Sequence, residues 1–210
     1  MRERMMRRIV ALLLVAMAGL SAAARANAAY VFQPKDADLS DLPHDKYFTW
    51  GINFTLPANE TITGATLEFA NIWDWTTEKN DHLFIHLLDN PKSGVKSFID
   101  NERGGDNFAG KGVLVGNWSD PIGGHPRNFN LIYDFGSGGL LDELKAYAAT
   151  TPGKNRDNFG FGIDPDCHYY NCGITFTITT ECGTVPGPVP EPTTVVMLTL
   201  GGLLLRRRTA

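Results

Sequence analysis

The sequence predicts an all-β protein: an antiparallel two-sheet sandwich, jelly-roll-like, with one short helix. Large apolar residues alternate with small or polar ones over many short stretches, which is the two-residue period of half-buried strands. Glycine is frequent, at 22 of 210 residues, and fills the gaps between these stretches together with Asn, Asp and Pro. Only one stretch has the period of a helix. Many short strands joined by such turns are typical of sandwiches.

The alternation is clearest in residues 48–56, where the even positions are large and apolar and the odd positions are small or polar. Pro57 and Asn59 then mark a turn before the alternation resumes, as either a hairpin or a crossover between sheets. The other expected strands are residues 62–69, 83–88, 95–99, 112–116, 128–135, 158–163 and 173–180.

The expected helix covers residues 140–148. Leu140, Leu141, Leu144 and Tyr147 share one face of it, and charged residues occupy the other face. The helix ends before Pro152-Gly153, which cannot continue it. We expect its apolar face to cover one end of the sandwich.

The N-terminus has the three parts of a secretory signal. Arginines in the first eight residues precede an apolar run at residues 9–20, and Ala26-Asn27-Ala28 fits the small-residue rule for cleavage. We therefore expect a signal peptide at residues 1–28, an exported chain that begins at Ala29, and one β-sandwich ectodomain at residues 29–182.

The ectodomain is acidic. Without the eight arginines at the two ends of the chain and Glu3, 11 basic and 22 acidic residues remain, which gives a net charge of −11. Binding to nucleic acid depends on clustered Lys and Arg, so the charge argues against a nucleic-acid partner. It is compatible with binding of divalent cations.

The C-terminal part has a different composition. Residues 183–189 form a Pro/Gly spacer that can neither pack nor pair, and Pro190, Glu191 and Pro192 follow it. Residues 193–205 are 13 uncharged, mostly apolar residues, fewer than the ~20 that a membrane-spanning helix needs. The chain then carries Arg206, Arg207 and Arg208, a basic cluster of the kind that stays on the cytoplasmic side of a membrane.

Residues 190–210 resemble the PEP-CTERM sorting signal of Gram-negative bacteria, which combines a Pro-Glu-Pro tripeptide, a short apolar segment and terminal arginines in this order. The resemblance covers only the C-terminal tail. It implies that the chain is a substrate of exosortase, a membrane transpeptidase-like cysteine protease. It further implies a transient stay in the inner membrane, and then a place on the outer surface or in the extracellular matrix with exopolysaccharide and biofilm.

Three cysteines occur late in the chain, at Cys167, Cys172 and Cys182. Cys172 and Cys182 lie at the two ends of an expected strand, about 30 Å apart at ~3.3 Å per residue, which is too far for a disulfide. Cys167 and Cys172 flank four residues and could close a tight loop in an exported protein. We expect a disulfide between Cys167 and Cys172, with reduced thiols as the alternative.

We expect no cofactor, with calcium bound in the acidic loops as the alternative. Asp164, Asp166 and Asn171 supply oxygen ligands close together, as calcium prefers, although they match no EF-hand loop. Without calcium, these are solvated loops. His82 and His86 lack the glutamate of a zinc-hydrolase helix, and we expect them to be structural.

Aromatic residues suggest a carbohydrate-binding surface. Trp73 and Trp75 lie two residues apart and share a face if the chain is extended, while Trp118, Tyr169 and Tyr170 fall in expected loops. Exposed rings stack on the apolar faces of sugars. The alternative is that these rings belong to the core.

These features predict an exported, non-enzymatic surface or matrix protein that is sorted by exosortase and associated with exopolysaccharide. One alternative is a hydrolase of envelope polysaccharide that uses Asp74, Glu68 or Asp164 as acid and base. Another is a structural adhesin, with neither a glycan site nor a catalytic site.

Overall fold

The computed structural model describes residues 27–35, 39–79, 81–101 and 104–183. Residues 27–182 form one compact unit. The expected sorting signal, with Pro190, Glu191, Pro192 and the three terminal arginines, lies outside the described residues, as do residues 1–26 of the expected signal peptide. Asn27 and Ala28, which the signal peptide was expected to include, belong to the first strand.

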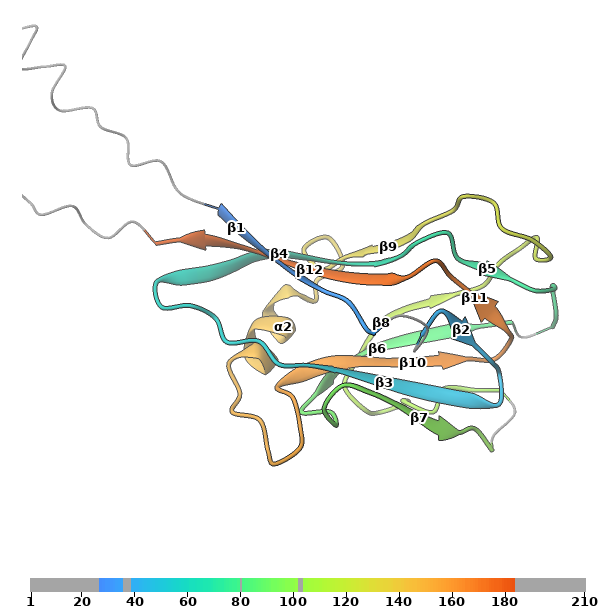
Figure 1. Cartoon of the computed structure of the whole chain (residues 1–210), viewed down its shortest axis with the longest axis horizontal. Coiled ribbons are helices and arrows are strands. Elements are labelled where there is room, and N and C mark those ends of the chain that lie inside the picture. Colours follow the sequence, from blue (N-terminus) through green and yellow to red (C-terminus); the bar gives the residue numbers. More distant parts are fainter. Residues whose placement is uncertain (1–26, 36–38, 80, 102–103, 184–210) are drawn as a thin grey trace, which may run out of the picture. The chain divides into compact units, whose positions relative to one another are not determined.

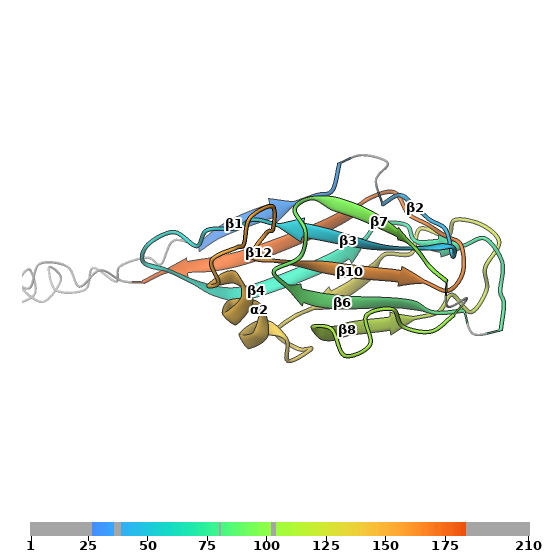
Figure 2. The same cartoon turned by 90° about the horizontal axis from the view of Figure 1, so that it is seen from below.

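Two antiparallel sheets form the body of the unit, one above the other (Figure 1). The first has the order β1 (Asn27–Phe32), β12 (Ile174–Cys182), β4 (Glu60–Phe69) and β9 (Leu131–Asp134). The second, seen face-on in Figure 2, has the order β7 (Val95–Ile99), β3 (Lys46–Ile52), β10 (Phe159–Pro165), β6 (Leu83–Asp89) and β8 (Val113–Trp118). The all-β sandwich that the sequence predicts is confirmed.

A third, small sheet was not predicted. It has the order β2 (Asp41–Leu42), β11 (Tyr169–Tyr170) and β5 (Trp73–Asp74), all antiparallel. Figures 1 and 2 both place it at the end of the sandwich opposite to Asn27 and Cys182, where β1 begins and β12 ends.

Aromatic rings join the two large sheets. The ring of Phe176, on β12, lies 4.9 Å from that of Phe161 on β10 and 5.8 Å from that of Phe159. Phe135 packs against both Phe176 and Phe161. All four side chains are buried, so these contacts are the centre of the core.

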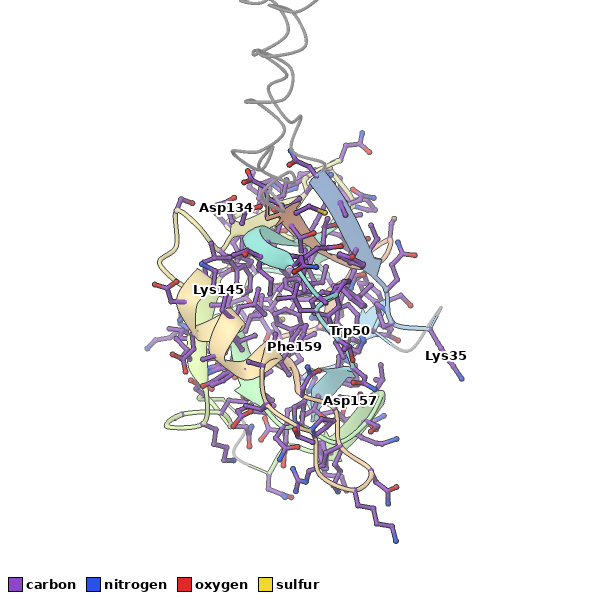
Figure 3. The ribbon with its side chains drawn as sticks, turned by 90° about the vertical axis from the view of Figure 1, so that its left-hand side faces the viewer. Lys35, Trp50, Asp134, Lys145, Asp157 and Phe159 are labelled. Carbon is purple, nitrogen blue, oxygen red and sulfur yellow. The ribbon has the colours of Figure 1, made fainter. Side chains whose placement is uncertain are left out.

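The helix α2 (Leu141–Ala148) covers one end of the core, as its periodicity predicts. Leu144 and Ala148 are buried, and the Asn158 side chain donates hydrogen bonds to the carbonyl oxygens of Ala148 (2.9 Å) and Phe54 (2.7 Å). Figure 3 views the unit from this end and shows side chains, including Trp50 and Phe159, filling the space between the layers. Within the described residues, no helix has the length and apolar character needed to cross a membrane.

Strands that follow one another along the chain do not pair with one another among the described elements. The segment after β3 is therefore a crossover to the other sheet, which settles the choice between hairpin and crossover that the sequence left open. Every strand pair is closed by contacts between distant parts of the chain, and such non-local topologies fold slowly.

The central strand β10 is buried on both faces. Phe159, Phe161 and Ile163 face the core, while Gly162 and Asp164 face outward under a segment that includes Phe108, and Gly160 faces outward beside Pro91. A Cβ atom at position 162 would lie 2.8 Å from three carbons of the Phe108 ring. Glycine is therefore required here by close packing of the segment over the sheet.

We expect Gly162→Ala to lower the free energy of unfolding by about 1–3 kcal/mol, because the added methyl group overpacks the contact with Phe108. Gly136→Ala is the control, since a Cβ there would meet only the Asp134 side chain, at 3.3 Å. Urea unfolding of the two variants measures the difference. Equal stability of Gly162→Ala and the wild type would show that the segment does not pack tightly on β10.

Candidate functional site

The small sheet brings together three segments that are far apart in sequence. Its middle strand, β11, aligns Tyr169 with Leu42 and Asp74, and Tyr170 with Asp41 and Trp73. Because side chains alternate along a strand, the sheet has one face with Trp73 and Tyr170 and an opposite face with Asp74 and Tyr169. The two faces differ sharply in chemistry.

The outer face carries a row of rings. Trp73 stacks on Tyr170 with ring centroids 4.7 Å apart, and Tyr170 stacks on His168 at 4.6 Å. Trp75 follows β5, and its backbone N–H donates to the His168 carbonyl oxygen (3.1 Å). The pairing of the two segments therefore continues, and Trp75 lies opposite His168 on the same face. The residue is 52% exposed. We call Trp73, Trp75, His168 and Tyr170 the aromatic ladder.

The carboxylate of Asp41 borders the aromatic ladder at His168. The Nε2 atom of His168 lies 2.5 Å from Oδ1 of Asp41, whose side chain is largely exposed. The ladder therefore combines flat apolar rings with a carboxylate and an imidazole at its edge.

The prediction that Tyr169 is a carbohydrate-binding residue is wrong. Its ring lies on the inner face and is fully buried, and its hydroxyl donates to Oδ1 of Asp81 (3.0 Å). Burial, followed by the charge of Asp81, raises the pKa of this hydroxyl. The sequence does not distinguish Tyr169 from Tyr170, because alternation alone does not tell which face of a strand is covered.

Trp118 lies apart from the aromatic ladder, at the end of β8. It stacks on Phe129 with centroids 5.7 Å apart, and it packs against the buried Tyr169 at 5.6 Å. Of the five aromatic residues that the sequence singled out, the structure thus stacks Trp73 and Tyr170 on the outer face, and Trp75 follows Trp73 along the chain. His168 completes this face and was not among the five.

The inner face carries a buried acidic cluster of Asp74, Asp81 and Cys167. One ligand atom from each of these side chains lies within 4.8 Å of the other two. The Cys167 thiol donates to Oδ1 of Asp74 (3.1 Å), and the Glu78 backbone N–H donates to Oδ2 of Asp81 (3.2 Å). Burial, and then the neighbouring Asp81 carboxyl group, raises the pKa of Asp74. Burial likewise raises the pKa of the Cys167 thiol, and Asp74 adds to it.

Asp120 supports β5 from the side. Its Oδ2 accepts the backbone N–H of Asp74 (3.2 Å), and its Oδ1 accepts the Ile122 N–H and a hydrogen bond from the Arg127 guanidinium. Burial alone would raise the pKa of Asp120, but Arg127 and these N–H groups hold it below its ordinary value. Asp120 is therefore an ionised anchor for the strand that carries Trp73 and Asp74.

The expected disulfide between Cys167 and Cys172 is wrong. All three cysteines are free thiols. The residues between Cys167 and Cys172 include the extended strand β11 instead of closing a tight loop. Cys167 is consequently buried beside Asp74, whereas Cys172 is exposed, with its Sγ atom 3.4 Å from the Asn71 side-chain nitrogen.

The candidate calcium ligands serve other contacts. Asp164 accepts the backbone N–H of Asn107 (2.6 Å) and its side-chain amide, and Asp166 accepts the Gly105 N–H (3.1 Å). The Asn171 side chain instead donates to the Leu39 carbonyl oxygen and accepts the Gly173 N–H. Asp164 and Asp166 thus hold the segment that covers β10, and Asn171 holds a different turn.

The two histidines make structural contacts. His86 is buried, with Nε2 2.8 Å from Oδ2 of Asp106 and Nδ1 3.2 Å from the Lys111 carbonyl oxygen. His82 contacts the side chains of Asn117 and Ser119. These partners tie strand β6 to β8 and to the segment over β10.

The three carboxylates proposed for hydrolysis lie on different sheets. Asp74 is on β5, Glu68 on β4 and Asp164 on β10, and Glu68 accepts a hydrogen bond from the Asn130 amide (2.7 Å). Asp74 and Asp164 are both fully buried. A glycosidase needs its two carboxylates on either side of a cleft that admits the sugar, and the burial of Asp74 and Asp164 leaves neither carboxylate open to a sugar in this structure.

No protein-family model matches this sequence, and none of the curated proteins is significantly similar to it. The class of this protein therefore follows from its fold and its site. It is a β-sandwich protein with a small accessory sheet that is aromatic on its outer face and acidic beneath.

We expect the stability of the protein to fall as pH rises from 4 to 7, in part because of Asp164. Burial raises the pKa of this carboxyl group to about 6, so the folded state holds a proton that the unfolded state releases at lower pH. At ~1.4 kcal/mol per pKa unit, Asp164 accounts for a loss on the order of 3 kcal/mol across this range.

Asp164→Asn, which is neutral at every pH, should remove that part of the loss, as measured by urea unfolding at pH 4 to 7. Asp142→Asn is the control, since the Asp142 side chain is 98% exposed. Parallel stability curves for the wild type and Asp164→Asn would contradict the expectation.

Proposed function

We propose that this is an exported, non-enzymatic surface or matrix protein that binds polysaccharide through the aromatic ladder. The observation that carries the proposal is the row of rings on the outer face of the small sheet, with Trp75 half exposed beside the Trp73–Tyr170–His168 stack. Sequence features supply the remainder of the proposal, namely export by the signal peptide and sorting by exosortase.

The chemistry of the aromatic ladder suits a sugar. Tryptophan and tyrosine rings offer a flat apolar face against which the C–H groups of a pyranose pack, while their edges stay polar. His168 and Asp41 lie at the border, where they can exchange hydrogen bonds with hydroxyl groups. The rings form a row on a sheet face, which favours a polymer that runs across several rings over a small molecule enclosed in a pocket.

The position of the aromatic ladder also fits a protein held at its C-terminus. The small sheet lies at the end of the sandwich opposite to Cys182, after which the Pro/Gly spacer begins (Figure 1). A protein sorted to the outer surface through its tail would then present the rings away from the point of attachment. Exopolysaccharide is the ligand class that the PEP-CTERM resemblance suggests, and the rings supply a chemistry that fits it.

We expect the protein to bind polysaccharides on a glycan array and Trp75→Ala to weaken that binding about tenfold or more, because it removes the most exposed ring at low structural cost. Trp75→Phe should retain part of the affinity, since a smaller ring remains. Val31→Ala is the matched control: Val31 is a similarly exposed apolar residue, on β1 of a different sheet.

Each alternative has its own outcome. If the wild type binds no glycan, the structural adhesin replaces the proposal. If binding is the same in Trp75→Ala and the wild type, a glycan site exists elsewhere on the protein and the aromatic ladder is not it. Release of new reducing ends from a bound polysaccharide would instead support the hydrolase.

A further inference from the structure

We infer that Asp74, Asp81 and Cys167 bind a transition-metal ion of the zinc type beneath the small sheet. The inference does not rest on the proposed glycan binding, since it concerns the opposite face of the sheet and its tests need no sugar.

The three side chains converge from three separate segments. Asp74 belongs to β5, Cys167 lies just before β11, and Asp81 lies just before β6. They are 0%, 1% and 6% exposed, respectively, and their ligand atoms lie within 4.8 Å of one another. A tetrahedral zinc ion separates an oxygen from a sulfur ligand by roughly 3.5 Å, given metal–ligand bonds of ~2.0 and ~2.3 Å. The 3.1 Å between Cys167 Sγ and Asp74 Oδ1 is close to that separation.

One atom in the cluster has no N–H or O–H donor. Among the described residues, no such group donates to the Oδ2 atom of Asp74, which is fully buried; its neighbour is the Asp81 carboxyl group, and a hydrogen bond between the two carboxyl groups contributes to the raised pKa of Asp74. In the part of the chain that the structure describes, neither Asp74 nor Asp81 forms an ion pair with a basic side chain. Two adjacent buried carboxyl groups without a cation are costly, and a metal ion removes that cost while it satisfies Oδ2 of Asp74.

The thiol decides which ion fits. Calcium takes six to eight oxygen ligands and does not use sulfur, whereas zinc and similar ions bind thiolate and carboxylate together. Glu78 is placed to be a fourth ligand, with its Oε2 3.9 Å from Cys167 Sγ, and the Thr76 carbonyl oxygen lies at the same distance. Binding converts the Cys167 thiol to a thiolate and releases its proton.

The cluster has a route to solvent. A surface depression of about 330 Å³ is lined by Glu78, Asp81, His82 and Asp120, among others. Asp81 thus belongs both to the cluster and to the wall of this depression. A metal ion can reach the ligands there without opening the sandwich.

A metal ion at this position would join residues 74–81 to the segment that enters β11. These are the same two segments that carry the rings of the outer face. The ion would therefore hold the small sheet together from below, in a position where the sheet has only two-residue strands of its own.

Cadmium and zinc titrations of the metal-free, reduced full chain test the inference. Cd²⁺ should produce an ultraviolet thiolate-to-metal charge-transfer band that saturates at one ion per chain, and Zn²⁺ should compete for it. Cys167→Ser should abolish the band, whereas Cys172→Ser and Cys182→Ser, which alter the other two thiols, should keep it. Asp81→Asn should weaken Zn²⁺ binding, measured by calorimetry, by about tenfold or more.

A wild type without the band, or a band that persists in Cys167→Ser, would overturn the inference. So would Ca²⁺ binding at this site with no involvement of the thiol. Should Cys167→Ser fail to fold, as circular dichroism would show, the wild-type band and the Asp81→Asn affinity still decide the question.

Discussion

The connection from β10 to β12 is the constraint on which the rest of the structure depends. Each is an interior strand of one of the two large sheets, and the rings of Phe161 on β10 and Phe176 on β12 meet at the centre of the core. The chain passes from one to the other through Cys167 and β11. The middle strand of the small sheet is thus the link between the two best-packed strands of the sandwich. Packing of the core therefore fixes where the aromatic ladder and the acidic cluster lie, and Cys167 of the acidic cluster is itself one of the core residues.

The sequence predicts most of the long strands because a two-residue period appears in the chain itself: most bury one face, and in β10, which is buried on both faces, Gly160 and Gly162 alternate with large apolar residues. It does not predict β1, whose first residues were assigned to the signal peptide. Residues 95–99 match β7 residue for residue, and the helix is found within one residue of its start. The two-residue strands of the small sheet are too short to show a period. Pairing could not be predicted either, since consecutive strands do not pair and turns therefore carry no information about register.

The candidate site shows the same limit at the level of single residues. Alternation predicts that Trp73 and Trp75 share a face, and the backbone hydrogen bond from Trp75 to His168 is consistent with it. The choice between Tyr169 and Tyr170 depends on which side of β11 is covered, and only the folded chain shows it. Asp81 and Cys167 are 86 positions apart, so no local pattern could bring them together. Asp164 and Asp166 were recognised as oxygen donors, but their partners proved to be backbone N–H groups. The acidity of the protein has a structural use of this kind at several points, since buried aspartates such as Asp120 and Asp157 also accept N–H groups of neighbouring segments.

The pairing of the first and last strands has a mechanical consequence. β12 is hydrogen-bonded on both sides, to β1 and to β4, and it runs from the small sheet towards Cys182. Interstrand hydrogen bonds of an antiparallel sheet lie perpendicular to the strands. Tension between a polymer on the rings and a tether at the C-terminus would therefore pull along β12. It would load the hydrogen bonds to β1 and those to β4 in shear. Such a geometry shares the force among many bonds at once, so a protein that binds polymer and is tethered as proposed would resist being drawn out of a surface layer by flow.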